Sequence, residues 1–191
     1  MFGTRVVVAD SDLSFRRKLK DILNHAGYLV TGEPARGKET LQMVFQIEPD
    51  LVVLESRLPG SEGIDVAGII GEHMVAPVVL TVDGRRQDLG ELVRKTGVYG
   101  ILAKPLQEMS VLPVLETAIV CFEQVVKLQK QVNELRKKLE ARRLVEQAKG
   151  LLMESKGLTE QQAYKYLQRL SMDQCLPIAK VARQVVLSLQ G

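Results

Sequence analysis

Charged and hydroxyl side chains follow four of the short apolar runs in the first half of the sequence. Asp10 and Asp12 follow the run at residues 5–9, and Glu55 follows the run at 51–54. Thr81 closes the run at 77–81, and Lys104 follows the run at 100–103. Carboxylates, a hydroxyl and an amine are the groups that bind Mg²⁺ and stabilise a transferring phosphoryl group. If these runs are parallel strands, their C-terminal ends meet at one edge of a sheet. We therefore predict a polar pocket there.

The first 105 residues alternate apolar runs with amphipathic stretches. The apolar runs predict strands buried on both faces at residues 5–9, 28–31, 51–54, 77–81 and 100–103. Helical spacing predicts helices between them, within residues 15–26, 41–48, 64–73 and 88–96. Strand–helix units in this order predict an α/β fold with a five-stranded parallel, doubly wound sheet.

Residues 4–120 resemble the receiver domain of two-component response regulators, a flavodoxin-like fold. The resemblance is carried by Val7–Asp12, Pro49–Glu55, Leu58–Gly60, Gly63–Asp65, Leu80–Thr81 and Ala103–Pro105. It implies that two adjacent carboxylates and an acceptor Asp hold Mg²⁺. It further implies that the Lys and the Thr stabilise the phosphoryl group. When the Thr binds the new phosphate, an aromatic side chain on the fifth strand would turn inward with it.

The sequence departs from that receiver pattern at three positions. Ser11 stands in place of the second carboxylate, Glu55 in place of the acceptor Asp, and Ile101 in place of the aromatic residue, although Tyr99 lies two residues earlier. Glu is one methylene longer than Asp, which is enough to misplace a nucleophile for in-line attack. We therefore expect that this receiver is not phosphorylated in the ordinary way.

Three interpretations of the pocket around Glu55 remain open. The carboxylate imitates the phosphorylated state by pairing with Lys104, or the two form an ion pair with no switching role. In the third, Asp10 and Asp12 retain weak Mg²⁺ binding. Apart from this weak Mg²⁺ binding we expect no cofactor.

From Ser110 to about Ser155 the sequence has helical periodicity and no strand signal. Apolar residues step by three and four, which is typical of a coiled-coil seam. The seam consists of Ala118, Cys121, Val125, Leu128, Val132, Leu135 and Leu139. A dimerising coiled coil is the favoured reading, although a seam of this width also fits packing against the chain's own helices.

The C-terminal part combines small helices with excess positive charge. Residues 136–191 contain 11 basic and 5 acidic side chains, against 15 and 18 in residues 1–135, so the two parts carry +6 and −3. Gly157, the capping box Thr159–Gln162 and Pro177 divide the segment into three helices. A basic helical surface of this kind indicates an anionic partner such as nucleic acid.

This segment is similar to the ANTAR domain, which is named for transcription antitermination. The similarity is carried by Arg142–Met153, Leu158–Tyr164, Arg169–Met172 and Val181–Ala182. It implies a dimer that binds hairpin RNA in a nascent leader transcript. We thus predict three regions: a receiver-like domain at 1–120, a coiled-coil linker at 110–141 and an ANTAR-like RNA-binding domain at 136–191.

Basic stripes and one aromatic residue are the candidate RNA contacts. A spacing of seven places Arg142, Lys149 and Lys156 on one face of a helix, and such stripes can track phosphates. Tyr164 is the candidate for stacking on a loop base, whereas Tyr166 fits the helix core. The predicted RNA-binding residues are Arg142, Arg143, Lys149, Lys156, Tyr164, Lys165 and Arg169.

Composition excludes several classes of protein. A hydrophobic fraction of 46%, 26% charged residues and two Cys are typical of a soluble globular protein, not of a disordered or disulfide-stapled one. The sequence contains no run of about 18 consecutive apolar residues, so we expect no membrane span. The first apolar run is too short for the core of a signal peptide. We expect a cytoplasmic protein. Without a nucleophile–base pair, P-loop or metal cluster, we expect no enzyme activity.

Two other functions compete with RNA binding. A DNA-binding regulator would read the major groove from the third C-terminal helix, which offers Lys180, Arg183 and Gln184. A scaffold would dimerise through the tail and bind a sensor or regulatory protein on the receiver face.

Overall fold

The computed structural model describes residues 3–83 and 89–190. The chain divides into two compact units, Met1–Lys127 and Leu128–Gly191. One helix, α5 (Glu108–Lys156), runs from the first unit into the second.

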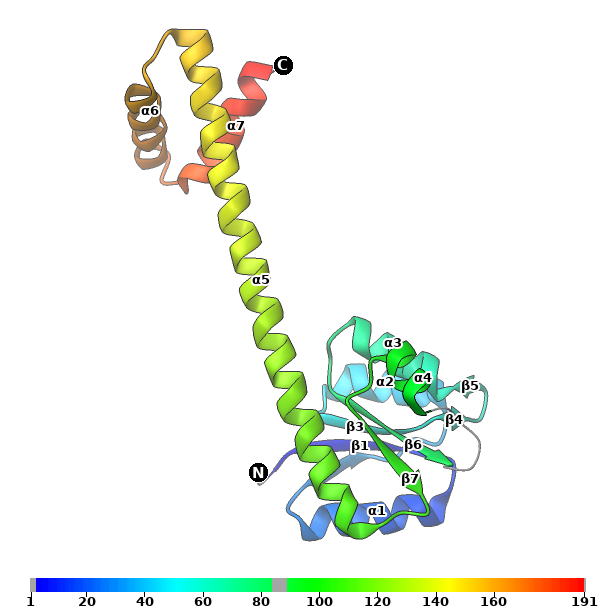
Figure 1. Cartoon of the computed structure of the whole chain (residues 1–191). Coiled ribbons are helices and arrows are strands. Elements are labelled where there is room, and N and C mark those ends of the chain that lie inside the picture. The colour runs from blue at the N-terminus through cyan, green and yellow to red at the C-terminus, as the bar shows by residue number, and fades with distance from the viewer. Residues whose placement is uncertain (1–2, 84–88, 191) are drawn as a thin grey trace. The chain divides into compact units, whose positions relative to one another are not determined.

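The first unit has a five-stranded parallel sheet in the order β2-β1-β3-β6-β7 (Figure 1). The strands are β1 (Arg5–Ala9), β2 (Leu29–Gly32), β3 (Leu51–Glu55), β6 (Val78–Asp83) and β7 (Gly100–Lys104). This is the doubly wound, flavodoxin-like receiver fold that the sequence predicts. Each predicted strand is present with bounds shifted by two residues or fewer.

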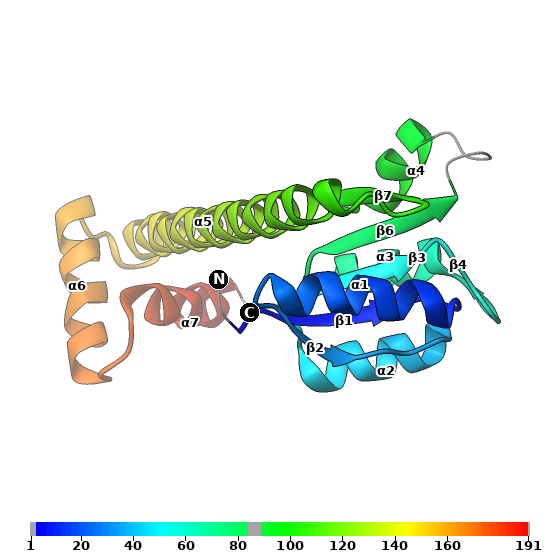
Figure 2. The ribbon, with the colours of Figure 1, turned by 90° about the horizontal axis from the view of Figure 1, so that it is seen from below.

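Helices cover both faces of the sheet. Helices α1 (Leu13–His25) and α5 pack on one face, and α2 (Gly37–Ile47) and α3 (Gly63–Glu72) on the other, where α4 (Leu89–Thr96) contacts α3 (Figures 1 and 2). Alternate residues of each strand enter opposite cores, and this explains the continuous apolar runs. In β1, Val6 and Val8 face α1 and α5, whereas Val7 faces α2 and α3.

A short hairpin follows β3, between the predicted strand at 51–54 and the predicted helix at 64–73. Its strands β4 (Arg57–Leu58) and β5 (Ser61–Glu62) pair antiparallel across the turn that contains Gly60. Two-residue strands carry too little periodicity to be recognised.

The second unit is a three-helix bundle built from the C-terminal part of α5, α6 (Glu160–Asp173) and α7 (Ile178–Gln190) (Figure 2). Its core contains Leu152, Ala163, Leu167 and Val181, all fully or almost fully buried. Gly157, with φ +64, ends α5, and the predicted capping box of Thr159 and Gln162 begins α6.

Helix α5 also contains an 18-residue window with a mean hydropathy of 1.6, which is long and apolar enough to cross a membrane. Charged residues such as Glu116 and Glu123 interrupt the apolar residues of this window, so it does not stand out as a continuous apolar run. Val111, Leu115, Ala118 and Ile119 of this helix are buried against the sheet. The apolar residues of the window are therefore accounted for in part by the receiver core.

Candidate functional site

The C-terminal edge of the sheet holds a cluster of polar side chains. Asp10 directly follows β1, Glu55 and Lys104 are the last residues of β3 and β7, and Thr81 lies in β6. Adjacent parallel strands place Glu55 beside Thr81. The structure therefore brings these predicted pocket residues together, with Ser11 beside them.

Lys104 joins the two carboxylates. Its Nζ lies 2.9 and 2.7 Å from the two carboxylate oxygens of Asp10 and 2.8 Å from Oε1 of Glu55. The side chains are 21% exposed for Lys104, 1% for Asp10 and 17% for Glu55. The ammonium also lies 4.4 Å from the centre of the Phe15 ring, a cation–π distance.

Both oxygens of the Glu55 carboxylate accept hydrogen bonds from the protein. Lys104 donates to Oε1, while the Ser11 amide and hydroxyl donate to Oε2 at 2.8 and 2.6 Å. A carboxylate that is held on both oxygens cannot approach a phosphoryl group without losing these bonds. The longer side chain and Ser11 thus complement each other in this pocket.

Asp10 is held by three neighbours. Besides Lys104, the Thr81 hydroxyl donates to it at 3.1 Å and the Asp12 amide at 3.0 Å. The Arg16 guanidinium donates to the Asp10 carbonyl oxygen. The hydroxyl that would bind a new phosphate in an ordinary receiver is therefore engaged with a carboxylate.

Asp12 has a different role from the weak Mg²⁺ binding that the sequence left open for it. Its carboxylate caps α1, accepting from the amides of Ser14 at 2.8 Å and Phe15 at 3.3 Å. With Asp12 used as a cap, Asp10 paired to Lys104 and Ser11 supplying a neutral hydroxyl, the donor set does not suit Mg²⁺.

The protonation equilibria follow from burial and from Lys104. Burial raises the pKa of Asp10, and the bonds from Lys104 and the Asp12 amide offset this only in part. Burial alone would raise the pKa of Glu55, but the bonds from Lys104 and Ser11 outweigh it and hold the pKa below 4.5. Burial lowers the pKa of Lys104, yet its two carboxylate partners raise it overall. The group thus favours an ionised Glu55–Lys104 pair.

Sequence reasoning missed three contributors to this pocket. Phe15 and Arg16 lie within the helix predicted at 15–26, and nothing in its spacing indicates that they contact the pocket. Gly63 approaches so closely that a β-carbon there would lie 1.9 Å from the Glu55 carbonyl oxygen. The run Pro59–Gly63 signals a turn, but only the fold brings it against the end of β3.

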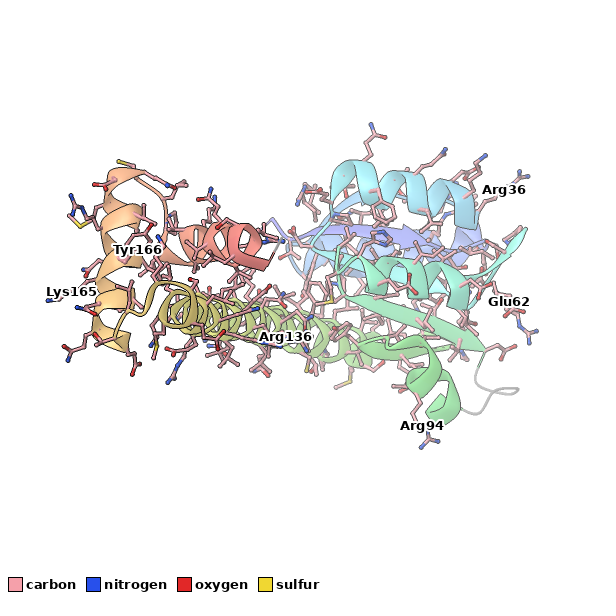
Figure 3. All side chains as sticks on the ribbon, turned by 90° about the horizontal axis from the view of Figure 1, so that it is seen from above. Arg36, Glu62, Arg94, Arg136, Lys165 and Tyr166 are labelled. Carbon is pink, nitrogen blue, oxygen red and sulfur yellow. The ribbon has the colours of Figure 1, made fainter. Side chains whose placement is uncertain are left out.

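The basic residues predicted to bind RNA divide into two groups. Arg142, Arg143, Lys165 and Arg169 are exposed, and Figure 3 shows Lys165 projecting away from the bundle while Tyr166 lies on its inner side. Lys149 differs, because it is only 8% exposed and pairs with Glu146 and Glu160 at 2.8 Å each. Those partners raise the pKa of Lys149.

Lys156 is also engaged within the domain. Its Nζ lies 4.5 Å from the Tyr166 ring centre and 3.1 Å from the Tyr166 hydroxyl. The predicted stripe of Arg142, Lys149 and Lys156 is therefore not a row of free cations, because spacing by seven does not reveal acidic or aromatic partners on a neighbouring helix.

Tyr164 lies at a hollow on the surface of the bundle. The ring is 47% exposed, and the hollow, of about 660 Å³, is lined by Lys149, Glu160, Gln161, Tyr164, Lys165 and Gln168. It combines an aromatic face with amide and charged groups.

Comparisons with known proteins agree with this arrangement of two units. Residues 6–116 match the response regulator receiver domain, and residues 133–186 match the ANTAR domain. The transcriptional regulatory protein PdtaR of Mycobacterium tuberculosis is 35% identical over 187 residues, which cover 98% of this chain and 91% of that protein. The chemotaxis protein CheY of Thermotoga maritima is 32% identical over 118 residues, 59% of this chain and 95% of that protein.

Solved structures support the fold of the first unit. The signal receiver domain of the response regulator NarL from M. tuberculosis superimposes with a TM-score of 0.56 at 23% identity, covering 64% of this chain and 98% of that one. Together with the two domain matches and PdtaR, this means that the chain belongs to the response regulators in which a receiver domain is joined to a C-terminal ANTAR domain.

Proposed function

We propose that this protein regulates transcription by antitermination, binding hairpin RNA in a nascent leader transcript as a dimer. The observation that carries the proposal is the hollow at Tyr164, lined also by the exposed Lys165, in a domain that matches ANTAR over residues 133–186. Such regulators are not enzymes, and we propose that this one acts in the cytoplasm.

The hollow suits an unpaired RNA base. Single-stranded loops are recognised by stacking of splayed bases on aromatic rings and by hydrogen bonds to the base edges. Tyr164 offers the ring, and Gln161 and Gln168 offer amide groups beside it. We therefore propose that Tyr164 stacks on a loop base.

The cations that lack a close acidic or aromatic partner within the described chain are the candidates for phosphate contacts. We propose Arg142, Arg143 and Lys165 for this role, with Arg169, whose only recorded ion pair in the described chain is a 4.0 Å contact with Asp173. Lys149 instead stabilises the bundle by linking α5 to Glu160 at the start of α6. Lys156 supports the Tyr166 ring.

The seam on α5 supports dimerisation. Val125, Leu128, Val132, Leu135 and Leu139 are between 40% and 68% exposed in the single chain, so they are not used for packing within it. Cys121 continues this seam and is also exposed. We propose that a second copy of the chain covers these residues in a coiled coil.

We propose that the receiver is controlled without ordinary phosphorylation, by a sensor or regulatory protein on the receiver face. The bonds on both Glu55 oxygens and the engagement of Thr81 support this. Incubation with Mg²⁺ and acetyl phosphate, followed by mass spectrometry, should give no adduct. A phosphoryl group on Glu55 would refute the proposal.

RNA binding is tested by fluorescence anisotropy with a two-hairpin RNA. With about six phosphate contacts, the slope of log K against log salt should be roughly −4. Tyr164→Ala should weaken loop discrimination and leave the slope unchanged, whereas Lys165→Ala should reduce the slope by about one.

A duplex DNA of equal length tests the competing hypothesis of a DNA-binding regulator, because Lys180, Arg183 and Gln184 on α7 are exposed. Tighter DNA than RNA binding would overturn the proposal.

A further inference from the structure

The seam of α5 changes from apolar to cationic at one end. Residues 136–143 contain five cations and one anion, and in the described chain none of these five cations has an ion-pair partner. The apolar positions of the seam stop at Leu139, which is 68% exposed. Arg136 is seen on this part of α5 in Figure 3. Two chemically different surfaces therefore follow one another along the same helix.

Heptad positions locate these cations relative to a partner helix. The alternating spacing places Val125, Val132 and Leu139 at the a positions and Leu128 and Leu135 at the d positions. In a parallel coiled coil, Val at two of the three a positions with Leu at d favours two strands. A second copy of this chain in parallel register is thus the partner that fits the seam. In that register each a residue packs against the same a residue of the other copy, and each d residue against the same d residue.

In that register the next d position is Arg142. Arg136 and Arg143 occupy the flanking e positions, and Lys138 occupies a g position. In a parallel coiled coil, the g residue of one chain faces the e residue of the following heptad in its partner. Lys138 of each copy therefore faces Arg143 of the other, and the two Arg142 side chains meet at the seam.

We infer that the end of the coil forms a cationic collar, made of Lys138, Arg142 and Arg143 from both copies, which binds the phosphate backbone of an RNA stem. The collar is incomplete in a single chain. This inference rests on the proposed RNA-binding function and adds a second contact, separate from the hollow at Tyr164.

The collar couples RNA binding to dimerisation. Like charges at facing positions oppose association, and a polyanion that binds only the paired helices shifts the equilibrium toward the dimer. The RNA-free dimer should therefore be weak at low salt and should tighten as NaCl rises from about 50 to about 500 mM, because salt screens exposed repulsion. RNA affinity should change in the opposite direction.

The test is sedimentation equilibrium of the full chain with Lys138→Glu and Lys137→Glu. Both variants change charge equally at exposed positions, but Lys137 occupies an outward f position. Lys138→Glu turns two repulsive pairs per dimer into attractive ones and should tighten the RNA-free dimer about tenfold. Lys137→Glu should remain within about twofold of the parent chain. Circular dichroism verifies that both variants are folded.

A blunt RNA duplex of about 16 base pairs, which has no loop, is the probe for the collar. It should shift the parent chain toward the dimer at least fivefold. The inference is overturned if the duplex leaves the equilibrium unchanged, if Lys138→Glu does not tighten the dimer, or if the RNA-free dimer is already tight at low salt. Hairpin RNA that still binds in those cases would leave the proposed function intact, whereas loss of all RNA binding would overturn both.

Discussion

Replacing Lys104 by Met tests whether the receiver pocket is a locked ion group. The substitution keeps the aliphatic stem and removes the ammonium that lies 2.7–2.9 Å from Asp10 and Glu55. Breaking a buried pair costs about 3–5 kcal/mol because the remaining charge is left uncompensated. Since Glu55 keeps its two bonds from Ser11, we expect a loss of about 3 kcal/mol in the free energy of unfolding at pH 7.5.

The loss should depend on pH with a defined sign. In the parent chain the pKa of Glu55 is below its ordinary 4.5, so the stability that Glu55 contributes is present above that pH and is lost as pH falls. Without Lys104, burial raises the pKa of both carboxyl groups. The folded variant then binds protons more tightly than the unfolded one, and its stability falls as pH rises. The difference between the two proteins should shrink to about 1 kcal/mol near pH 4.5.

The assay is a urea titration read by a brief deuterium pulse at fixed pH, following peptides from β1 and β3. These strands lie at the centre of the sheet, so they report on the receiver alone. Lys18→Met is the matched control, because the Lys18–Glu108 pair on α1 and α5 is exposed, and its loss should cost less than about 1 kcal/mol. A loss below about 1 kcal/mol for Lys104→Met at pH 7.5, or one that is independent of pH, would refute the reasoning.

Three further substitutions address other parts of the chain. Gly63→Ala should destabilise the receiver by about 1–3 kcal/mol, because the new β-carbon meets the Glu55 carbonyl oxygen; an unchanged urea midpoint would show that β3 can move away. Thr159→Ala should lower the stability of the bundle by about 1 kcal/mol through loss of the capping box, and melting of the α6 helix signal by circular dichroism measures it. Lys149→Met should leave the salt slope of RNA binding unchanged, because Glu146 and Glu160 neutralise this ammonium; a slope reduced by about one would make Lys149 a phosphate contact after all.

The order of the elements and the identity of the pocket residues were available from the sequence. Strands buried on both faces appear as continuous apolar runs, as in Val6–Ala9, and polar residues directly after such runs must meet at one sheet edge. The motifs around Lys104 and in Arg142–Met153 are specific enough to identify both domains. These signals are local in sequence, and this is why they can be read without a structure.

The state of each polar group was decided only by the tertiary structure. Thr81 turned out to donate to Asp10, Phe15 to lie beneath Lys104, and Lys149 to be paired with Glu160 across two helices. Each of these outcomes depends on a partner brought close by packing, at distances of 2.8–4.4 Å. Hydrogen bonds and ion pairs act over only a few ångströms. Residue type and spacing therefore predict which groups gather, whereas three-dimensional packing decides which of them remain free to bind a ligand.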